Sequence, residues 1–507
     1  MSGFVVVQGA QDAESLRKSF ARIRHRGPFL SGMDGDGSIR MAQNYLQADC
    51  PGADPETSAV PLRSNEDGRT RICYDGQMGN AAELGRAAGC APGPFLEERL
   101  ILKLYADFGS KMLDRLNDAI FAFVISDGEK LFAARDVFGI KTMFYGRVNG
   151  SLYLTSELKS LKEVTDDVNE FPPGHFMDGS GRLTRFASLP EAPPETWTEG
   201  ADAIARRVYE IIERSVRARV DFARPTACLL SGGMDSSAIA HIAAQIHREH
   251  FGDGKRLKSY AIGSRDSGDL PNARLMAEQA GTDHEELVMD LDLLLDVLPE
   301  VIYSLESFDP SLVRSAAANF LISRHAAREG YEVLLSGEGG DEIFCGYTYL
   351  KDFPAEELFA RQMECIGYLH NNASLRLDRA NLWNSVRVVA PLISGELFEY
   401  ALGIPPEYKQ RPMNGKKVEK WIFRKAFAEA LPGEITERLK QEFSQGSGSA
   451  GLLPDHFETV YSDDELAEAR SKHPLIRSKE ELHYFRLFTD RFGEGKAVAT
   501  VGQWKHL

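Results

Sequence analysis

Two stretches of this chain share one pattern, and they constrain its fold more than any other feature. "LLSGGMDSSAIAHIAAQI" (229–246) and "LLSGEGGDEIFCGYTYL" (334–350) each run from apolar residues through a Ser-Gly turn into helical spacing. An amphipathic helix is predicted ahead of both, over 204–220 in "IARRVYEIIERSVRARV". Strand, glycine turn and helix recurring in this order predict a parallel sheet covered by helices.

The first turn has the composition of an anion-binding site. Its glycines, Gly232 and Gly233, permit positive φ and let backbone N–H groups approach an anion closely. The following helix N-terminus adds unpaired donors, and the hydroxyls of Ser231, Ser236 and Ser237 could donate to phosphate oxygens. The GxxxxGK[ST] pattern of a Walker loop is absent. Asp235 would be misplaced beside a phosphate unless a cation lay between them, so we interpret it as a Mg²⁺ ligand.

The second turn carries two acids, Glu338 and Asp341, which are three residues apart and could therefore face one site. Asp341 could share the cation with Asp235, while Glu338 could act as a general base or orient a nucleophile. Taken alone, the stretch also fits a capped helix whose acids complement the helix dipole. Two such turns in one parallel sheet favour the shared site.

The first half of the chain has a different pattern. "IFAFVIS" (120–126), "TMFYGRV" (142–148) and "SLYLTS" (151–156) are short apolar or alternating runs bounded by turn residues. They predict hairpin strands of an antiparallel sheet. "LEERLILKLYADFG" (96–109) has helical spacing, so this part of the chain is expected to mix α and β structure.

A linker segment separates the two halves. At 507 residues the chain is too long for one ordinary core. Prolines and acids interrupt both periodicities in "SLPEAPPETWTEGAD" (188–202), which predicts one domain over 1–190 and a second over 200–507. Beyond about residue 355 the chain is expected to be mostly helical, including "VEKWIFRKAFAEALP" (418–432).

Composition excludes several classes of protein. A formal net charge of −16 argues against nucleic acid as a partner, because phosphate binding needs concentrated Lys and Arg. No apolar run approaches the length of a membrane span, and no secretory signal pattern is present, so no membrane association is expected. The 6 cysteines are scattered without metal-ligand spacing, which predicts neither a structural zinc nor disulfides and favours the cytoplasm.

Eleven motifs together resemble those of the asparagine synthetase family, which includes the β-lactam, carbapenam and lasso-peptide macrolactam synthetases. In the second half they are "SGGMDSS", "SLESFDPSLVRSA", "LLSGEGGDEIFCGY", "KWIFRKAFAEALP" and "RLKQEFSQGSG". In the first half they are "RIRHRGP", "YDGQMGNAAEL", "RLNDAIFAFVISD", "RDVFGIKTMFY", "SELKSL" and "EFPPGHF". The resemblance implies an α/β and α+β protein of two domains. The first would be an Ntn-hydrolase-like glutaminase domain of stacked antiparallel sheets, and the second an ATP-pyrophosphatase-type parallel α/β synthetase domain.

The resemblance also implies a reaction. ATP and Mg²⁺ would activate a carboxylate as an acyl-adenylate, and an amine would then displace AMP. Asp235 and Asp341 would ligate Mg²⁺, Lys440 would stabilise developing negative charge, and Glu338 would assist the incoming amine. The residues implied to hold the nucleotide and its phosphates are Leu230, Ser231, Gly232, Gly233, Asp235, Ser236, Ile262, Arg314, Ser336, Gly337 and Lys420.

The glutaminase site departs from the family pattern. Members that hydrolyse glutamine use an N-terminal cysteine, and here that position is Ser2. Asp75 replaces an asparagine whose amide would donate to the oxyanion, a loss that typically costs about 2.7–4 kcal/mol. Asn44 and Gln77 cannot supply the charges that would hold glutamine. The full set of positions at this degenerate site is Ser2, Asn44, Asp75, Gly76, Gln77 and Glu97, of which only Gly76 keeps its type.

These changes predict a ligase without a working glutaminase. The amine would be ammonia or a group within the same substrate, which would give a lactam or a peptide macrolactam. The alternative is asparagine synthesis from aspartate with ammonia or glutamine, and a non-catalytic scaffold is a third hypothesis.

The acceptor segment departs as well. In "SVRVVAPLIS" (385–394), Arg387, Val389 and Ser394 replace residues of other charge, which predicts a changed substrate pocket. Members of the family are often dimers, so the resemblance further implies a homodimer.

Overall fold

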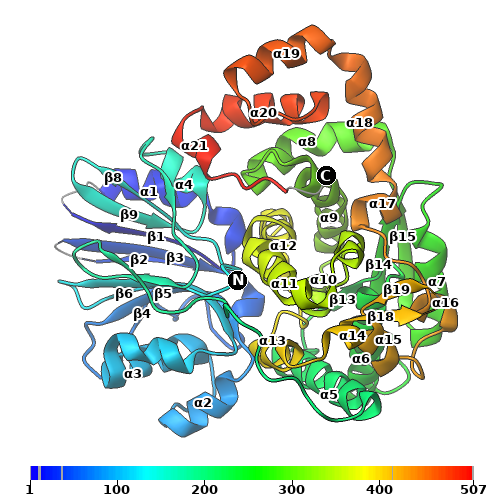
Figure 1. Ribbon diagram of the computed structural model, residues 1–507. Helices are drawn as coiled ribbons and strands as arrows, with labels where there is room; N and C mark the ends of the chain where they lie inside the picture. Colours follow the sequence, from blue (N-terminus) through cyan, green and yellow to red (C-terminus); the bar gives the residue numbers. More distant parts are fainter. Residues whose placement is uncertain (1, 10–12, 36–37, 65, 414, 505–507) are drawn as a thin grey trace. The chain divides into compact units, whose positions relative to one another are not determined.

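The chain passes from one structural unit to another in the Pro-rich linker, between Leu189 and Pro190. The computed structural model describes residues 2–9, 13–35, 38–64, 66–413 and 415–504. One unit comprises Met1–Leu189 and Phe492–Thr500, and the other comprises Pro190–Arg491 and Val501–Leu507 (Figure 1). The predicted second domain over 200–507 did not anticipate this return of the chain. Within the returning segment, Lys496 Nζ lies 2.5 Å from Asp167 Oδ1 of the first unit.

The described residues of the first unit form two antiparallel sheets of six strands each. The first sheet consists, in spatial order, of β10 (Asn169–Glu170), β8 (Phe144–Val148), β9 (Ser151–Thr155), β1 (Ser2–Gln8), β3 (Ile39–Tyr45) and β2 (Leu30–Asp34). The second consists of β12 (Leu183–Arg185), β11 (His175–Met177), β7 (Leu131–Arg135), β6 (Ala119–Ser126), β5 (Arg71–Met78) and β4 (Leu62–Arg63). The predicted strands over 120–126, 142–148 and 151–156 correspond to β6, β8 and β9.

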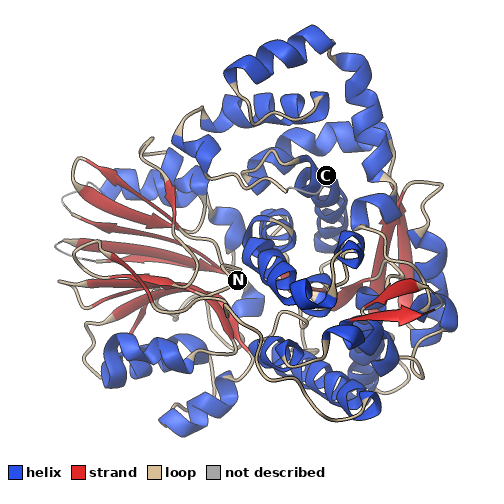
Figure 2. Cartoon of the chain, in the orientation of Figure 1, coloured by secondary structure: helices blue, strands red, loops and turns tan. Residues whose placement is uncertain are grey.

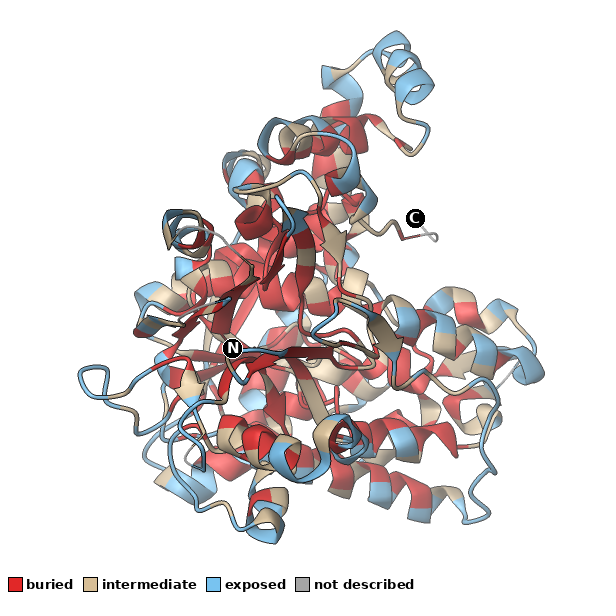
Figure 3. Cartoon of the chain, turned by 90° about the vertical axis from the view of Figure 1, so that its left-hand side faces the viewer, coloured by how far each residue is buried: buried red, intermediate tan, exposed pale blue. Residues whose placement is uncertain are grey.

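A hydrophobic core lies between the two sheets, whose strands are largely buried (Figure 3). Phe4 and Val6 of β1 pack in one cluster with Val124 of β6 and Ala133 of β7. Helices α1 (Ala13–Ala21) and α4 (Leu158–Lys162) contact strands of the first sheet. The predicted helix over 96–109 corresponds to α3 (Leu96–Phe108), which contacts β5 of the second sheet. Helix α2 (Ala81–Ala88) packs against α3. The sheets and helices therefore form four layers, with the two sheets inside.

In the part of the second unit that the structure describes, five strands form a parallel sheet. In spatial order they are β15 (Asp283–Val288), β14 (Lys258–Gly263), β13 (Thr226–Leu229), β16 (Val333–Leu335) and β17 (Arg387–Val389). All residues of β16 are buried, as expected for a parallel strand covered on both faces. Chain order reverses at β13, since β14 and β15 extend the sheet on one side and β16 on the other.

Most of the remaining chain of this unit is helical (Figure 2). Its helices are α5 (Ala201–Arg219), α6 (Met234–Phe251), α7 (Asp269–Ala280), α8 (Leu291–Leu305), α9 (Pro310–Arg328), α10 (Gly340–Phe344), α11 (Leu358–Tyr368), α12 (Ala373–Trp383), α13 (Gly395–Leu402), α14 (Pro406–Lys409), α15 (Trp421–Ala426), α16 (Gly433–Thr436), α17 (Phe443–Ser447), α18 (Ser449–Val460), α19 (Asp463–Lys472) and α20 (Lys479–Phe492). The short α21 (Lys496–Ala499) lies in the segment that belongs to the first unit. No helix in the described part of the chain is both long and apolar enough to cross a membrane.

One predicted helix is wrong over half its length. The stretch 418–432 begins in β19 (Lys416–Glu419), which forms a hairpin with β18 (Gln410–Met413). Lys420 then adopts the left-handed conformation with φ of 52°, which cannot continue a helix. Helix α15 starts only after it.

Candidate active site

The two Ser-Gly turns lie side by side because the strands before them are neighbours. β13 and β16 pair in parallel, with Cys228 opposite Leu335, so both strands end at the same edge of the sheet. This is also the position where the strand order reverses, and ligands of open α/β sheets bind in the crevice at such a point. One turn continues into α6 and the other into α10.

Glycine is required where the turns meet. A Cβ on Gly337 would lie 2.4 Å from the backbone nitrogen of Ser236 and 2.5 Å from the carbonyl carbon of Asp235. Since both atoms belong to the backbone, a side chain at this position would force the turns apart. The residue type therefore fixes how closely the second turn approaches the start of α6.

Donors gather at the start of α6. The helix begins after Gly233, and no side chain caps it, so its first N–H groups are available to an anion. Ser231 Oγ lies 3.0 Å from Ser236 Oγ and accepts from the N–H of Gly233 at 3.3 Å. Two hydroxyls and a helix N-terminus thus face the same point, an arrangement suited to phosphate oxygens.

Four charged side chains link the two turns to the C-terminal part of the unit. Lys420 Nζ lies 2.5 Å from Asp235 Oδ2 and 2.7 Å from Asp341 Oδ1. Lys440 Nζ lies 2.5 Å from Asp341 Oδ2. The lysines and carboxylates therefore alternate across the crevice.

The pKa values of the two carboxylates shift in opposite directions. Burial alone would raise the pKa of Asp341, but Lys420 and Lys440 lower it to about 2. The pKa of Asp235 is raised by burial and by the neighbouring Asp341, against the effect of Lys420. Asp341 and Asp235 raise the pKa of Lys440 in spite of its burial, so Lys440 is a cation at neutral pH.

The same carboxylates fit a divalent cation. Asp235 Oδ1 is buried and has no hydrogen-bond partner within the described residues. It belongs to one of two carboxylates that reach the crevice from adjacent turns, and Mg²⁺ prefers such oxygen donors. Asp235 and Asp341 are therefore suited to hold it.

Most of the predicted synthetase residues surround one pocket. The predicted residues on its wall are Leu230, Ser231, Gly233, Asp235, Ser236, Ile262, Ser336, Gly337, Glu338, Asp341, Lys420 and Lys440. Gly232 does not line it but forms the turn itself, with φ of 68°.

Arg314 is the exception among the predicted phosphate ligands. The guanidinium, on α9, pairs with Glu480 of α20, with Nε 2.9 Å from Oε1. Glu480 is only 2% exposed, and a buried carboxylate needs a cationic partner. Arg314 is not on the pocket wall. That Arg314 meets phosphate stays a prediction.

The acceptor segment lies against the second turn, where the N–H of Ser336 donates to the carbonyl of Val389 at 2.9 Å. Arg387 and Val389 are on strand β17, and Ser394 caps α13 by accepting from the N–H of Leu397 at 3.3 Å. None of the three substituted residues lines the pocket. That they alter the substrate site stays a prediction.

Other residues on the wall had no assigned role. Arg438 Nη2 lies 2.6 Å from Asp269 Oδ1, and its Nη1 donates to the carbonyl of Ser231 at 3.3 Å. Arg438 stands two residues before Lys440, so the motif that pointed to the lysine could have pointed to it. Arg376 and Asn319 also line the pocket from helices that carried no motif signal at these positions.

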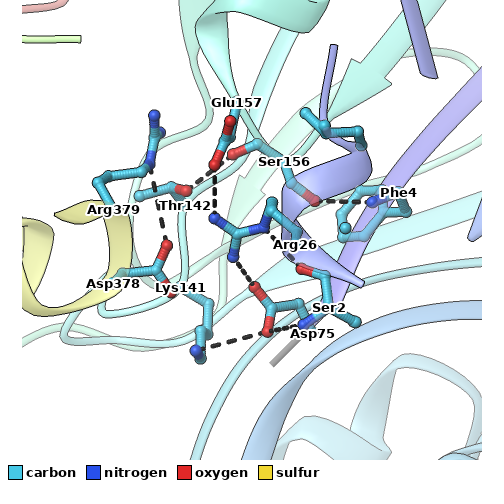
Figure 4. Close-up of polar contacts among 12 residues, drawn as sticks. Ser2, Phe4, Arg26, Asp75, Lys141, Thr142, Ser156, Glu157, Asp378 and Arg379 are labelled. Atoms are coloured by element: carbon cyan, nitrogen blue, oxygen red, sulfur yellow. Dashed lines mark hydrogen bonds and ion pairs between the residues drawn. The ribbon is translucent and has the colours of Figure 1, made fainter. Parts of the chain in front are cut away.

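In the first unit, Ser2 is buried and hydrogen-bonded to Arg26 and Asp75 (Figure 4). The residue is 1% exposed, and its Oγ donates to the carbonyl of Tyr74. The same Oγ accepts from Gln43 Nε2 at 2.9 Å. The backbone N–H of Ser2 donates to Asp75 Oδ1 at 3.1 Å.

Asp75 is the centre of a buried ion-pair network. Its Oδ2 lies 2.7 Å from Arg26 Nη2, and its Oδ1 lies 3.4 Å from Lys141 Nζ (Figure 4). Arg26 in turn pairs with Glu157 at 2.8 Å and donates to the carbonyl of Ser2 at 2.7 Å. Arg26, Asp75 and Lys141 are each fully buried.

The remaining positions of the degenerate site divide into two groups. Asn44 joins the Ser2 segment, accepting from the N–H of Gly3 at 2.7 Å and donating to the carbonyl of Ile23 at 2.8 Å. Glu97 instead accepts from the N–H of Met78 at 3.1 Å and from the hydroxyl of Tyr74.

Gly76 and Gln77 both lie on β5. A Cβ on Gly76 would lie 2.3 Å from Tyr74 Oη, so this position has no room for a side chain. Gln77 is 6% exposed.

Known proteins resemble the chain along almost its whole length. A model of the asparagine synthase family matches residues 207–364 and 353–485, and a model of the glutamine amidotransferase domain matches residues 1–179. An asparagine synthetase [glutamine-hydrolyzing] of Lotus japonicus is 30% identical, over 97% of this chain and 86% of its own length. A probable asparagine synthetase [glutamine-hydrolyzing] of Schizosaccharomyces pombe is 33% identical, over 99% of this chain and 96% of its own.

Proposed function

This chain belongs to the asparagine synthase family and is an ATP-dependent carbon–nitrogen ligase, and on that premise we propose that it amidates the side-chain carboxylate of aspartate with free ammonia. The names of the two relatives support aspartate as the carboxylate. Nothing in those names supports closure of a lactam or macrolactam, so we do not extend the proposal to it.

The pocket between the turns would receive ATP. Backbone N–H groups at the start of α6, together with the hydroxyls of Ser231 and Ser236, would bind phosphate oxygens. Asp235 and Asp341 would hold Mg²⁺, which when bound would offset the charge of the triphosphate. Ile262 and Leu230 would supply apolar wall.

Two further side chains have roles that fit the transfer of charge. Lys440 would stabilise negative charge as pyrophosphate leaves and as AMP is displaced, and its ion pair with Asp341 supports a fixed position. Glu338, on the same wall, would accept a proton from the incoming ammonium so that neutral ammonia attacks.

The environment of Asp75 is the observation that carries the choice of ammonia. Where the resemblance implies an amide N–H donor for the oxyanion, this chain has a buried carboxylate paired with Arg26 and Lys141. A carboxylate donates nothing to an oxyanion, and loss of one such donor typically costs about 2.7–4 kcal/mol. Ser2 also has its hydroxyl committed to the carbonyl of Tyr74.

The test compares two nitrogen sources. Purified enzyme is given ATP, Mg²⁺ and aspartate with either ammonium chloride or glutamine, and pyrophosphate, asparagine and glutamate are measured. We expect turnover with ammonium, no turnover with glutamine and no release of glutamate. Ser2→Ala should leave the ammonium reaction unchanged.

Two results would contradict parts of the proposal separately. Glutamine-dependent turnover that is lost in Ser2→Ala would restore a working glutaminase to the first unit. Release of pyrophosphate with another acid but not with aspartate would remove aspartate and leave the ligase.

A further inference from the structure

One wall of the pocket carries polar groups that the proposed reaction does not use. The residues concerned are Asn319 on α9, and Asn372, Ala373 and Arg376 at the start of α12. Helices α9 and α12 pack against each other, and all four residues line the same pocket. None of them belongs to the turns that would bind ATP.

Arg376 is a buried cation whose hydrogen bonds are incomplete. Its side chain is 7% exposed, and Nη2 donates to Glu338 Oε2 at 2.5 Å. Nε is buried and has no hydrogen-bond partner within the described part of the chain. The guanidinium carbon lies 5.5 Å from the centre of the Phe443 ring, which limits its movement. A buried guanidinium with an unused donor is costly unless a ligand supplies an acceptor.

The backbone adds to the attraction for an anion. α12 is 11 residues long, and no side chain caps its N-terminus at Asn372. Asn372 and Ala373 both line the pocket, so the uncapped end of the helix opens on it. The N-terminal dipole and the Arg376 guanidinium therefore favour the same negatively charged group.

Asn319, on the same pocket, offers a hydrogen-bond acceptor and therefore favours a cationic group. The residue is 3% exposed, and its Oδ1 is buried without a hydrogen-bond partner among the described residues. A buried amide oxygen is stabilised when it accepts a hydrogen bond, and an ammonium group could donate one. An acceptor for a cation and donors for an anion thus share one wall.

We propose that this wall is a recognition subsite for the α-amino-acid head of the substrate. Arg376 and the start of α12 bind the α-carboxylate, and Asn319 Oδ1 accepts a hydrogen bond from the α-ammonium. The inference rests on the proposed function in that the second, side-chain carboxylate is the one activated. A substrate that carries only the reacting carboxylate leaves both groups unpaired.

The experiment measures binding, so it does not depend on turnover. Aspartate, 3-aminopropanoate (which lacks the α-carboxylate) and succinate (which lacks the ammonium) are titrated calorimetrically into the full chain with Mg²⁺ and a non-hydrolysable ATP analogue. Wild type is expected to bind aspartate about 10–100-fold more tightly than 3-aminopropanoate, as one charge-assisted contact allows. Succinate is expected to be weaker than aspartate.

The variants separate recognition from structure. Arg376→Gln should weaken the binding of aspartate by about 10–100-fold and leave the binding of 3-aminopropanoate unchanged. Asn319→Leu should weaken aspartate and leave succinate unchanged. Arg376→Lys keeps a cation beside Glu338 but loses the planar fork, so it should recover only part of the preference. Arg361→Gln, an arginine of α11 paired with Glu364 outside the pocket, is the matched control and should bind all three ligands like wild type.

Equal affinity of wild type for aspartate and 3-aminopropanoate would overturn the inference. So would an equal loss for all three ligands in Arg376→Gln, because that pattern means the arginine only supports Glu338. If the binding pattern holds and no asparagine is formed, the subsite stands and the proposed function fails. If asparagine is formed without the pattern, the proposed function stands and the subsite fails.

Discussion

At the scale of single residues, Lys440 is the side chain whose removal tests the synthetase site most directly. Lys440→Ala should lower kcat by about 100–1,000-fold, since it would remove one stabilising charge from the reaction. Affinity for Mg·ATP should change little, because Asp341 keeps its ion pair with Lys420 at 2.7 Å. Pyrophosphate release gives kcat, and calorimetric titration of the ATP analogue gives affinity.

A matched lysine controls for loss of charge. Lys472, on α19, pairs with Glu468 at the surface and is 64% exposed at its side chain. Lys472→Ala should behave like wild type in both measurements. Full activity of Lys440→Ala would remove Lys440 from the reaction.

A buried acid in the first unit makes stability depend on pH. Burial, with the neighbouring Glu97, raises the pKa of Glu98 from 4.5 to about 7. The unfolded chain loses this proton near 4.5 and the folded chain keeps it to about 7, so the folded state binds more protons between those values. The free energy of unfolding therefore falls as pH rises through that window.

Glu98→Gln should remove this loss. Relative to wild type, the variant should gain on the order of 2 kcal/mol in the free energy of unfolding between about pH 5 and about pH 8. Urea unfolding followed by circular dichroism measures the change, and Glu83→Gln at an exposed position of α2 is the control. A difference between variant and wild type that does not vary with pH would refute the role of Glu98.

Residues near a motif could be predicted, and residues far from one could not. Ser231, Asp235 and Asp341 follow directly from strand and turn patterns, and the structure brings them together. Arg376 and Asn319 lie outside the motifs, so their place on the wall depends on how α9 and α12 pack in the folded unit. Arg314 lies within a motif, yet its ion pair could not be predicted, because the partner Glu480 is 166 residues away in the chain.

At the scale of elements, the approach of the second turn to α6 gives a test. Gly337→Ala would place a Cβ 2.4 Å from the backbone nitrogen of Ser236, and overpacking of this kind typically costs about 1–3 kcal/mol. We expect the affinity for Mg·ATP to fall by about 10-fold or more as the donors at the start of α6 move.

The control for this change is an unhindered glycine. A Cβ on Gly254 would meet no atom within 4 Å, so Gly254→Ala should bind ATP like wild type. Unchanged affinity in Gly337→Ala would mean that the contact between the turns does not shape the nucleotide site.

Elements with strong local signals were predictable from sequence. β6 and α3 follow from apolar runs and helical spacing that the surrounding layers simply bury. The stretch 418–432 has equally good helical spacing, yet Val418 and Glu419 pair with β18. The strand that pairs with them lies just before the stretch, and the left-handed Lys420 is bound by the distant Asp235 and Asp341, so the periodicity of 418–432 reports neither.

At the scale of the whole molecule, the two units can be observed separately. The chain has 4 tryptophans, Trp197, Trp383, Trp421 and Trp504, and all of them belong to the second unit. A saturating ligand at about 100 times its Kd adds about 2.7 kcal/mol to the stability of the unit that binds it. Mg·ATP should therefore raise the unfolding temperature reported by tryptophan fluorescence.

Circular dichroism reports on both units, so it serves as the comparison. We expect a part of its transition, belonging to the first unit, to stay unmoved by Mg·ATP. A shift of the whole dichroism transition together with the fluorescence would mean that the units unfold as one.

The return of Phe492–Thr500 to the first unit also bears on how the protein is made. The chain leaves that unit after Leu189, and about 300 residues follow before it comes back. At about 5–20 residues per second, a ribosome needs roughly 15–60 s to reach the missing piece. Throughout that interval the nascent first unit lacks α21, including Lys496, which pairs with Asp167. The unit that emerges first therefore stays incomplete until nearly all of the second unit has been synthesised.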